Sequence, residues 1–143
     1  MQVMQILKDK GSDVATMAGD ALVSDAVSLL NERRIGSIVI INGRGEIDGI
    51  LSERDIVHAL AERGPSLLEA RVADLMTRHV FTCTPDTSLE ELMRQMTRRR
   101  IRHLPVLDGG RLCGIISIGD VVKNRLMELE TEATTLRDYI GGR

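Results

Sequence analysis

The chain has few aromatic residues and few cysteines. Its 143 residues include one phenylalanine, one tyrosine, no tryptophan and two cysteines. So few aromatic rings exclude a stacking platform for single-stranded nucleic acid. Cys83 and Cys113 lie far apart in the sequence, so they form neither a disulfide framework nor a CxxC metal site. We therefore expect a reduced protein that holds no metal.

A large net charge and long apolar runs are also missing. The 19 basic and 21 acidic residues leave a formal charge of −2, so no global field draws the chain to nucleic acid or to an anionic membrane. No apolar run approaches the ~18 residues that a membrane span needs. Polar residues interrupt the apolar ones over residues 1–10, which excludes a secretory signal. We expect a cytoplasmic protein with one domain, or two small domains that share a core.

The chain does contain an internal repeat. Its clearest match joins residues 49–55 (GILSERD) to residues 114–120 (GIISIGD). Each segment reads glycine, two aliphatic residues, serine, two variable residues and aspartate, and we call them the first and the second motif. The predicted organisation is a helix at 1–13, repeats at 14–64 and 80–130, a linker at 65–79, and a helix end and tail at 131–143.

Hydrophobic periodicity predicts the order strand, helix, strand, strand, helix in each repeat. Ser24 or Asp25 is expected to cap the first of these helices, and Ser88 with Glu91 forms a capping box in the second repeat. Gly64-Pro65 is a loop signal. The predicted strands lie at 14–17, 37–41, 47–51, 80–82, 102–106 and 112–116, and the predicted helices lie at 1–10, 24–34, 53–63, 88–96 and 118–139.

Neither repeat can cover both faces of so small a sheet, so each is expected to bury its open face against the other. The predicted fold class is α/β (α+β). Two β-α-β-β-α repeats pack sheet to sheet with pseudo-two-fold symmetry, flanked by N-terminal and C-terminal helices. The run at 37–41 is almost continuously apolar and rich in β-branched residues, which is typical of a central strand.

The tandem repeats and their two motifs resemble a pair of CBS domains (cystathionine β-synthase domains). Residues 74–77 (DLMT) and residues 102–106 (RHLPV) support the resemblance, which covers most of the chain. It implies a regulatory module with two clefts between the repeats. Such clefts bind adenine nucleotides such as AMP, ADP, ATP, NAD or S-adenosylmethionine, and two modules often pair. It implies no catalysis.

A carboxylate on the first turn of a helix can accept hydrogen bonds from both ribose hydroxyls, and the ribose-binding aspartate of the family matches Asp55 and Asp120. Ser52 and Ser117 precede them at the expected N-caps, where hydroxyls, free N–H groups and the positive helix end suit a phosphate. Ser-x-x-Asp is also a capping arrangement, and both roles can coexist. The motif glycine lets other groups approach the backbone closely.

Two arginines are further phosphate candidates. Arg54 lies on the first turn of its helix, and Arg102 aligns with a family position that contacts phosphate. Their counterparts are Gly119 and Gly36, so the two sites are unequal, and the second motif is favoured if one cleft alone is filled. The alternative for Arg102, and for the arginines at 98–100, is a solvated helix end that complements the helix dipole.

Adenine needs an apolar slot and backbone hydrogen bonds at its edge. In the family, the opening strand and the middle strand of each repeat supply them. Pro105 cannot donate a ladder bond, so its strand is expected to be an edge or to be interrupted there. His103 is expected to pack on a strand, and His58 and His79 to lie on the surface. The adenine-pocket candidates are Thr16, Met17, Ser37, Ile38, Val39, Thr82, Cys83, His103, Leu104 and Pro105; the alternative for the aliphatic members is plain core.

We expect a stand-alone regulatory module and no enzyme, because Walker, GxGxxG and Cys–His nucleophile patterns are missing. No cofactor is required; the expected ligand is AMP, ADP, ATP or NAD, because arginines favour phosphates over S-adenosylmethionine. A homodimer and an unidentified protein partner are expected, with the terminal helices as docking surfaces. The alternatives are a dimerisation scaffold with unoccupied clefts, nucleic-acid binding through residues 98–102, and a weak hydrolase.

Overall fold

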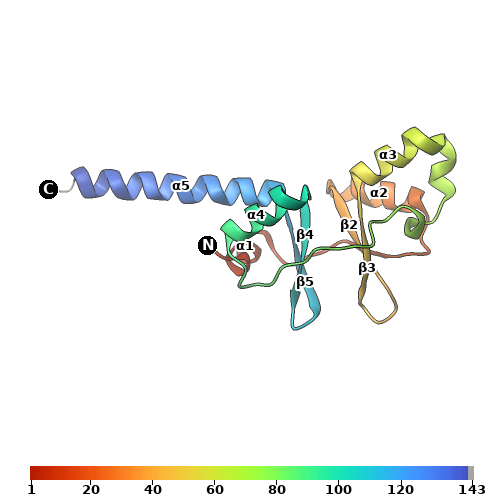
Figure 1. The fold of residues 1–143 in the computed structure, drawn as a ribbon, viewed down its shortest axis with the longest axis horizontal. Coiled ribbons are helices and arrows are strands. Elements are labelled where there is room, and N and C mark those ends of the chain that lie inside the picture. The colour runs from red at the N-terminus through yellow and green to blue at the C-terminus, as the bar shows by residue number, and fades with distance from the viewer. Residues whose placement is uncertain (142–143) are drawn as a thin grey trace.

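The computed structural model describes residues 1–141 (Figure 1). The element order largely follows the predicted periodicity. The α-helices are α1 (Val3–Lys10), α2 (Val23–Arg33), α3 (Glu53–Arg63), α4 (Leu89–Arg99) and α5 (Ile118–Gly141). The strands are β1 (Thr16–Ala18), β2 (Ser37–Ile41), β3 (Ile47–Ser52), β4 (His103–Asp108) and β5 (Arg111–Ser117), and two short 3-10 helices, η1 (Gly64–Glu69) and η2 (Val72–Asp74), link the repeats.

The first repeat contains a three-stranded sheet in the order β1-β2-β3. Strand β2 lies in the middle, as its apolar run predicts; it is parallel to β1 and antiparallel to β3. The second repeat has only β4 paired with β5. The strand predicted at 80–82 is wrong, because the chain there makes only an isolated bridge between Cys83 and Val106.

Pro105 explains why the two sheets differ. In the first repeat, the N–H of Val39 donates to the carbonyl of Ala15 at 3.0 Å and helps join β1 to β2. Pro105 aligns with Val39 and has no N–H to donate. The Cys83 N–H still donates to the Pro105 carbonyl at 3.0 Å, so the pairing is interrupted on this side of β4, as the sequence predicts.

The buried apolar residues form two clusters, one for each repeat. In β2, Ile38 and Ile40 point into the first cluster and are fully buried. Ser37 and Val39 point to the opposite face and are also buried, 6% and 0% exposed. Both faces of β2 are therefore covered, which agrees with the predicted packing of two small sheets. The mixed α/β class with paired repeats is confirmed.

The segment that precedes each repeat packs against the other repeat. Helix α1 comes before the first repeat, yet Val3 and Ile6 lie in the core of the second. Val72 and Met76 come before the second repeat and lie in the core of the first. Backbone hydrogen bonds fix both exchanges, from Val3 N–H to the Thr87 carbonyl at 2.9 Å and from Val72 N–H to the Ala21 carbonyl at 2.8 Å.

The glycine that opens each motif lies where this exchange needs space. A Cβ on Gly49 would lie 2.8 Å from the Met76 sulfur and 2.8 Å from the Thr77 carbonyl oxygen. A Cβ on Gly114 would lie 2.7 Å from a methyl of Leu7. Such distances are well inside van der Waals contact. Both glycines therefore admit a side chain from the segment that precedes the opposite repeat.

Two local predictions are wrong at helix starts. Helix α2 begins at Val23 with Leu22 as N-cap, so neither Ser24 nor Asp25 is the cap. The Val23 N–H donates to the Ala70 carbonyl at 2.9 Å, so the tertiary contact sets the start of the helix. Gly64-Pro65 begins the 3-10 helix η1 and is not a plain loop, because proline suits the first positions of a helix.

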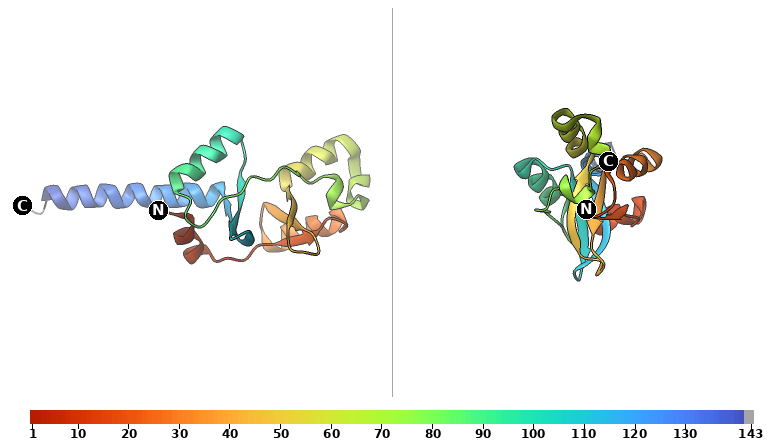
Figure 2. Two further views of the ribbon diagram at one scale, coloured as in Figure 1. Left: turned by 60° about the horizontal axis from the view of Figure 1, so that its bottom comes forward. Right: turned by 90° about the vertical axis from the view of Figure 1, so that its right-hand side faces the viewer.

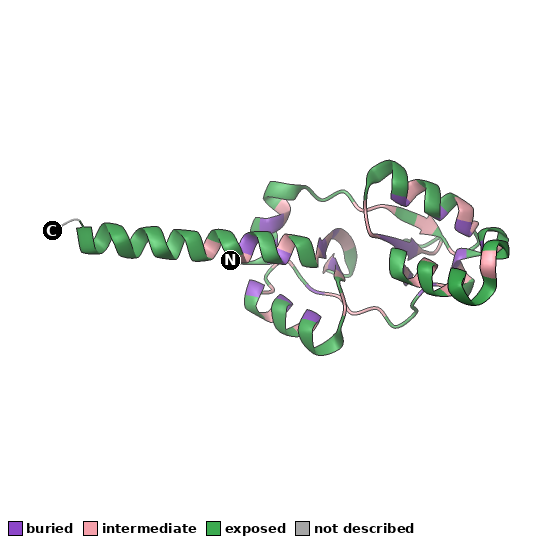
Figure 3. Cartoon of the chain, turned by 90° about the horizontal axis from the view of Figure 1, so that it is seen from above, coloured by how far each residue is buried: buried purple, intermediate pink, exposed green. Residues whose placement is uncertain are grey.

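Helix α5 gives the molecule an elongated shape (Figures 1 and 2). Its first turns lie against the second repeat, and the rest extends away from the body of the protein. Figure 3 shows its outer part as exposed along its length. Among residues 1–141, no helix is both long enough and apolar enough to cross a membrane.

Candidate functional site

A cleft of about 920 Å³ contains the first motif and faces from both repeats. One wall is the end of β3 and the start of α3, and the opposite wall comes from the second repeat and the segment before it. This size is typical of a site for a nucleotide-sized ligand. The lining residues are Gly36, Ile50, Ser52, Glu53, Arg54, Asp55, Val57, His58, Ala59, Glu62, Arg63, Asp74, Leu75, Thr77, His79, Val80, Phe81, Arg100, Ile101, Arg102 and His103.

Ser52 and Asp55 form a reciprocal capping box at the start of α3. The Ser52 N–H donates to Asp55 Oδ2 at 2.9 Å, and the Asp55 N–H donates to Ser52 Oγ at 3.2 Å. The capping alternative is thus correct for this pair. Within residues 1–141, Asp55 Oδ1 has no hydrogen-bond partner, so the carboxylate can still accept from a ligand.

The start of α3 has fewer free donors than the sequence predicts. The Glu53 N–H donates to the Gly36 carbonyl at 3.0 Å, and the Asp55 N–H is used by the cap. Among the described residues, the Arg54 N–H is left without a partner in this turn. A phosphate here would therefore depend on the Arg54 side chain more than on the helix end.

The second repeat contributes Phe81, the single phenylalanine, to the cleft. The Arg99 guanidinium lies 3.9 Å from the centre of the Phe81 ring, a cation–π contact. The His79 ring meets the same ring edge-on, with centroids 4.8 Å apart. Arg99 therefore packs on Phe81, while the arginines at 98–100 and 102 stay exposed.

His103 lies at the seam between the two repeats. Its Nε2 would be 3.2 Å from a Cβ placed on Gly36, and Glu53 is close to the same point. Burial lowers the pKa of His103, and the nearby charges of Lys10 and Arg102 act in the same direction, while Glu53 and Asp120 act to raise it. His103 is therefore neutral near pH 7 and packs between carboxylates of both motifs.

The second motif repeats the capping geometry but already holds a cation. Ser117 N–H donates to Asp120 Oδ2 at 2.8 Å, and Asp120 N–H donates to Ser117 Oγ at 3.2 Å. The Lys10 ammonium, at the end of α1, lies 2.7 Å from the same Oδ2 and 2.8 Å from the Ile115 carbonyl oxygen. Burial acts to raise the Asp120 pKa, but the bonds from Lys10 and Ser117 outweigh it, and the pKa is lowered.

The CBS domain family model matches residues 5–62 and 72–126. The chain belongs to this family. It is 32% identical over 148 residues to the mitochondrial CBS domain-containing protein CBSX3 of Arabidopsis thaliana, with 98% of this chain and 72% of that protein aligned. The match spans both motifs, so the two repeats are two CBS repeats.

Solved structures of CBS proteins share this fold. The CBS-domain containing protein ATU1752 of Agrobacterium tumefaciens superposes with a TM-score of 0.85 at 42% identity, covering 87% of this chain and 99% of that one. The CBS domain pair of protein MJ0100, solved in complex with 5-methylthioadenosine and S-adenosyl-L-methionine, superposes with a TM-score of 0.78 at 25% identity, covering 91% of this chain and 98% of that one.

The two motifs of this CBS pair are not equally open. Ser52, Arg54 and Asp55 of the first motif line the large cleft. Ser117 and Asp120 do not line it. A second, more open hollow of about 760 Å³ beside the second motif is lined by Arg102 and by residues of α5, among them Ile118 and Gly119. This geometry favours the first motif, whereas the sequence favours the second.

The structure also divides the other predicted site residues. Arg102 and His103, from the second CBS repeat, line the cleft beside the first motif. The remaining adenine-pocket candidates do not line it. Ser37, Ile38, Val39, Cys83, Leu104 and Pro105 are buried, Met17 and Thr82 are half-buried, and Thr16 is exposed on β1.

Sequence reasoning missed several residues of the cleft wall. Val80, Phe81 and Ile101 are each next to or near a predicted site residue, and together they provide the apolar surface opposite α3. The signal was a lone aromatic residue within an otherwise aliphatic repeat. His58 and His79 are exposed, as predicted, but they also line the cleft.

The cysteines do not contribute chemistry to this cleft. Burial, with a smaller effect of Cys113, raises the Cys83 pKa to about 12, so its thiol stays protonated. Burial also raises the Cys113 pKa. Both cysteines are free. Within residues 1–141, no group of three His, Cys, Asp or Glu side chains is arranged to hold a metal ion.

Proposed function

We propose that this CBS pair is a regulatory module that binds one adenine nucleotide in the cleft of the first motif. The observation that carries the proposal is the cleft itself, where a carboxylate with a free oxygen, two arginines and an apolar wall converge from both repeats. Asp55 would hold the ribose, and Arg54 and Arg102 would hold the phosphate. The adenosine ligands present in the MJ0100 complex support this ligand class.

The apolar wall opposite α3 is the best candidate for the adenine slot. Phe81 is held between Arg99 and His79, so its ring is ordered before a ligand arrives. Val80 and Ile101 extend the same surface. A planar base can pack on such a wall while backbone groups meet its edge. This assignment replaces the buried strand residues predicted from the sequence.

Regulation would follow from the position of the ligand between the repeats. Asp55 and Arg54 belong to the first repeat, whereas Arg102 and Phe81 belong to the second. A ligand that contacts both sides stabilises the arrangement in which these groups are close, and it shifts the population only by its differential affinity. The chain would pass this change to a protein partner, and AMP, ADP, ATP and NAD are favoured ligands because arginines favour phosphates.

A thermal-shift titration with AMP, ADP, ATP, NAD and S-adenosylmethionine tests the proposal, with GMP as the matched control base. A ligand that binds the folded chain raises Tm in proportion to the logarithm of its concentration. We expect a concentration-dependent rise with at least one adenine ligand and little change with GMP. No response to any of the five would favour a scaffold whose clefts stay empty.

A further inference from the structure

The outer face of α5 carries an apolar seam that nothing else in residues 1–141 covers. Its members alternate at spacings of four and three residues, which is the heptad pattern of a coiled coil. Val122, Leu126, Leu129, Leu136 and Ile140 are each 43–59% exposed. The seam consists of Val122, Leu126, Leu129, Ala133, Leu136 and Ile140.

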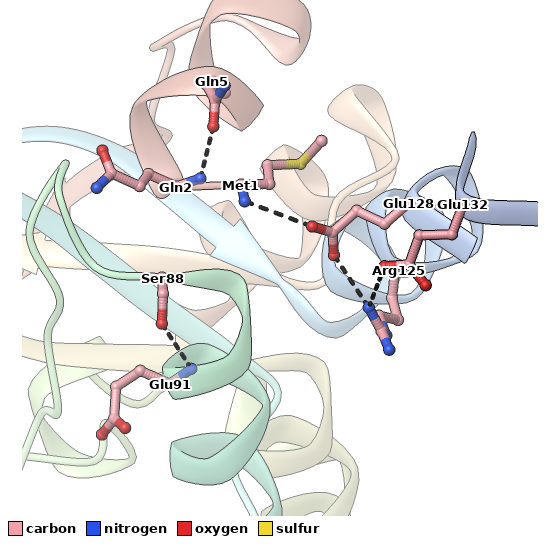
Figure 4. A network of polar contacts seen from close by, with 8 residues as sticks. All are labelled: Met1, Gln2, Gln5, Ser88, Glu91, Arg125, Glu128 and Glu132. Atoms are coloured by element: carbon pink, nitrogen blue, oxygen red, sulfur yellow. Dashed lines mark hydrogen bonds and ion pairs between the residues drawn. The ribbon is translucent and has the colours of Figure 1, made fainter. Parts of the chain in front are cut away.

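The seam points away from the protein's own body. Val121 and Asn124 are the buried residues of α5, and they lie on the opposite side of the helix from the seam. Glu128, on the same inner side, connects α5 to the N-terminus, since the Met1 ammonium lies 3.4 Å from its carboxylate (Figure 4). One face of α5 thus holds the helix in place. On the other face, Val122 and Leu126 border the hollow beside the second motif, and the rest of the seam is exposed.

The charges beside the seam identify the occupant. We infer that a second copy of this chain covers the seam, with the two α5 helices parallel. In a parallel pair, a residue that flanks the seam on one helix lies opposite the residue five positions later in sequence on the other helix. Arg125 would then face Glu130 of the second copy, and Glu132 would face Arg137 of the second copy. Both pairs are of opposite charge.

An antiparallel pair fits these charges less well. With the seams fully overlapped, Glu130 would face Glu130 of the second copy and Glu132 would face its own counterpart. Like charges at such positions oppose association. Sliding one helix by a heptad would separate these glutamates, but Ile140 of one copy would then lie beyond the start of the other α5 and would have no counterpart in the seam. In the single chain, Arg125 lies 3.4 Å from Glu128 and 4.0 Å from Glu132 of its own helix (Figure 4), so a parallel pair would add Glu130 of the second copy to these contacts.

This inference does not depend on nucleotide binding. The seam extends past residue 126, where the match to the CBS family model ends, and it does not include residues of the cleft. Pairing through α5 would link two CBS pairs and leave the first cleft of each copy accessible. The seam is short, so we expect a dimer whose population depends on protein concentration.

Sedimentation equilibrium of the full chain tests the inference, with Leu136→Glu as the disrupting variant and Thr135→Glu, on the side of the helix away from the seam, as the control. We expect wild type and Thr135→Glu to dimerise, and Leu136→Glu to weaken the dimer by at least ~100-fold, because each copy loses a buried leucine. A wild-type chain that stays monomeric at about 100 μM, above the micromolar-to-picomolar range of specific protein interfaces, would overturn the inference. A dimer unaffected by Leu136→Glu would do the same.

Two further measurements fix the orientation. Arg137→Glu should weaken the dimer and the double variant Glu132→Arg/Arg137→Glu should restore it, because the charges across a parallel seam are then exchanged. Under mild oxidation, Leu136→Cys should cross-link to itself, whereas Thr135→Cys and wild type should not. Equal cross-linking at both positions, or no rescue by the double variant, would contradict the parallel pair. Circular dichroism confirms that each variant keeps its helix content.

Discussion

The Lys10 ammonium lies 2.7 Å from Asp120 Oδ2 and closes the second motif with a residue from outside its repeat. Lys10 ends α1, which packs on the second repeat although it precedes the first in sequence. Asp55, the counterpart of Asp120, has no such cation among residues 1–141. The near-symmetry of the motifs is therefore broken by one lysine, and this difference leaves the first motif more open to a ligand.

Removing this lysine should weaken the protein in a pH-dependent way. The folded-state pKa of Asp120 is lowered, so its contribution to stability is present above the unfolded value near 4 and is lost as pH falls through the folded value. Lys10→Met should cost about 0.5–1 kcal/mol at pH 7, since the pair is only partly buried. Urea unfolding at pH 7 and pH 3 measures both effects.

The control for this experiment is Lys8→Met, on the same helix. Lys8 has no ion-pair partner within residues 1–141, so its loss should leave the pH dependence unchanged. Equal pH profiles for Lys10→Met and the wild type would show that the pair contributes nothing in solution.

His103 should lower stability in mildly acidic solution. Burial lowers its folded-state pKa, so the unfolded chain, with a histidine pKa near 6.5, binds the proton more readily. Unfolding free energy should then fall as pH drops from 7 through 6.5, and the fall should stop below the folded pKa. His103→Gln should flatten this part of the profile. A profile of His103→Gln that matches the wild type would refute the burial effect.

The motif glycines should differ in their tolerance of a methyl group. Gly49→Ala would place its Cβ against the Thr77 backbone carbonyl, which cannot move aside easily, and should cost about 1–3 kcal/mol. Gly114→Ala meets only the flexible end of Leu7 and should cost less. Chemical denaturation of both variants measures the difference. A larger loss of stability in Gly114→Ala than in Gly49→Ala would contradict the packing of Thr77 on Gly49 and of Leu7 on Gly114.

Arg34 ends α2 in the left-handed conformation with φ of 52°, and Arg100 ends α4 in the same way with φ of 54°. Glycine adopts this conformation without strain, so replacing either arginine by glycine relieves roughly 1 kcal/mol of backbone strain in the folded state. Part of this gain is lost because glycine makes the unfolded chain more flexible. Arg34→Gly should therefore raise the unfolding free energy by about 0.5 kcal/mol. Arg33→Gly, one residue earlier within the helix, should lower it by about 1 kcal/mol. Thermal unfolding of both variants measures these opposite changes in stability. A loss of stability in Arg34→Gly would contradict the expected relief of strain.

Much of the fold could be predicted because local pattern and tertiary packing agree. The bounds of α3 and β2 follow from a serine cap and from a run of β-branched residues. The start of α2 could not be predicted, because a backbone hydrogen bond from Val23 to the linker fixes it. The strand before α4 is missing because Pro105 has no N–H to donate. The sequence shows this missing donor, but its effect on pairing depends on the strand that would have lain beside β4.

The candidate site was less predictable than the fold. Asp55 and Arg54 lie in a motif that the repeat itself marks. The contribution of Phe81 and Arg102 to the same cleft depends on how the two repeats face each other, and the Lys10–Asp120 contact depends on where α1 packs. Local sequence patterns carry neither relationship, which is why the second motif appeared the better candidate.

Isothermal titration calorimetry of one adenine nucleotide with wild type, Asp55→Asn and Asp120→Asn tests the central claim most directly. Both aspartates cap a helix in the same way, and Asp120→Asn also weakens the contact with Lys10, so the structural cost of Asp120→Asn is at least that of Asp55→Asn. We predict one nucleotide per chain for wild type and for Asp120→Asn, and affinity at least ~10-fold weaker for Asp55→Asn, because a charged acceptor is lost. Loss of binding in Asp120→Asn with full affinity in Asp55→Asn would contradict the account.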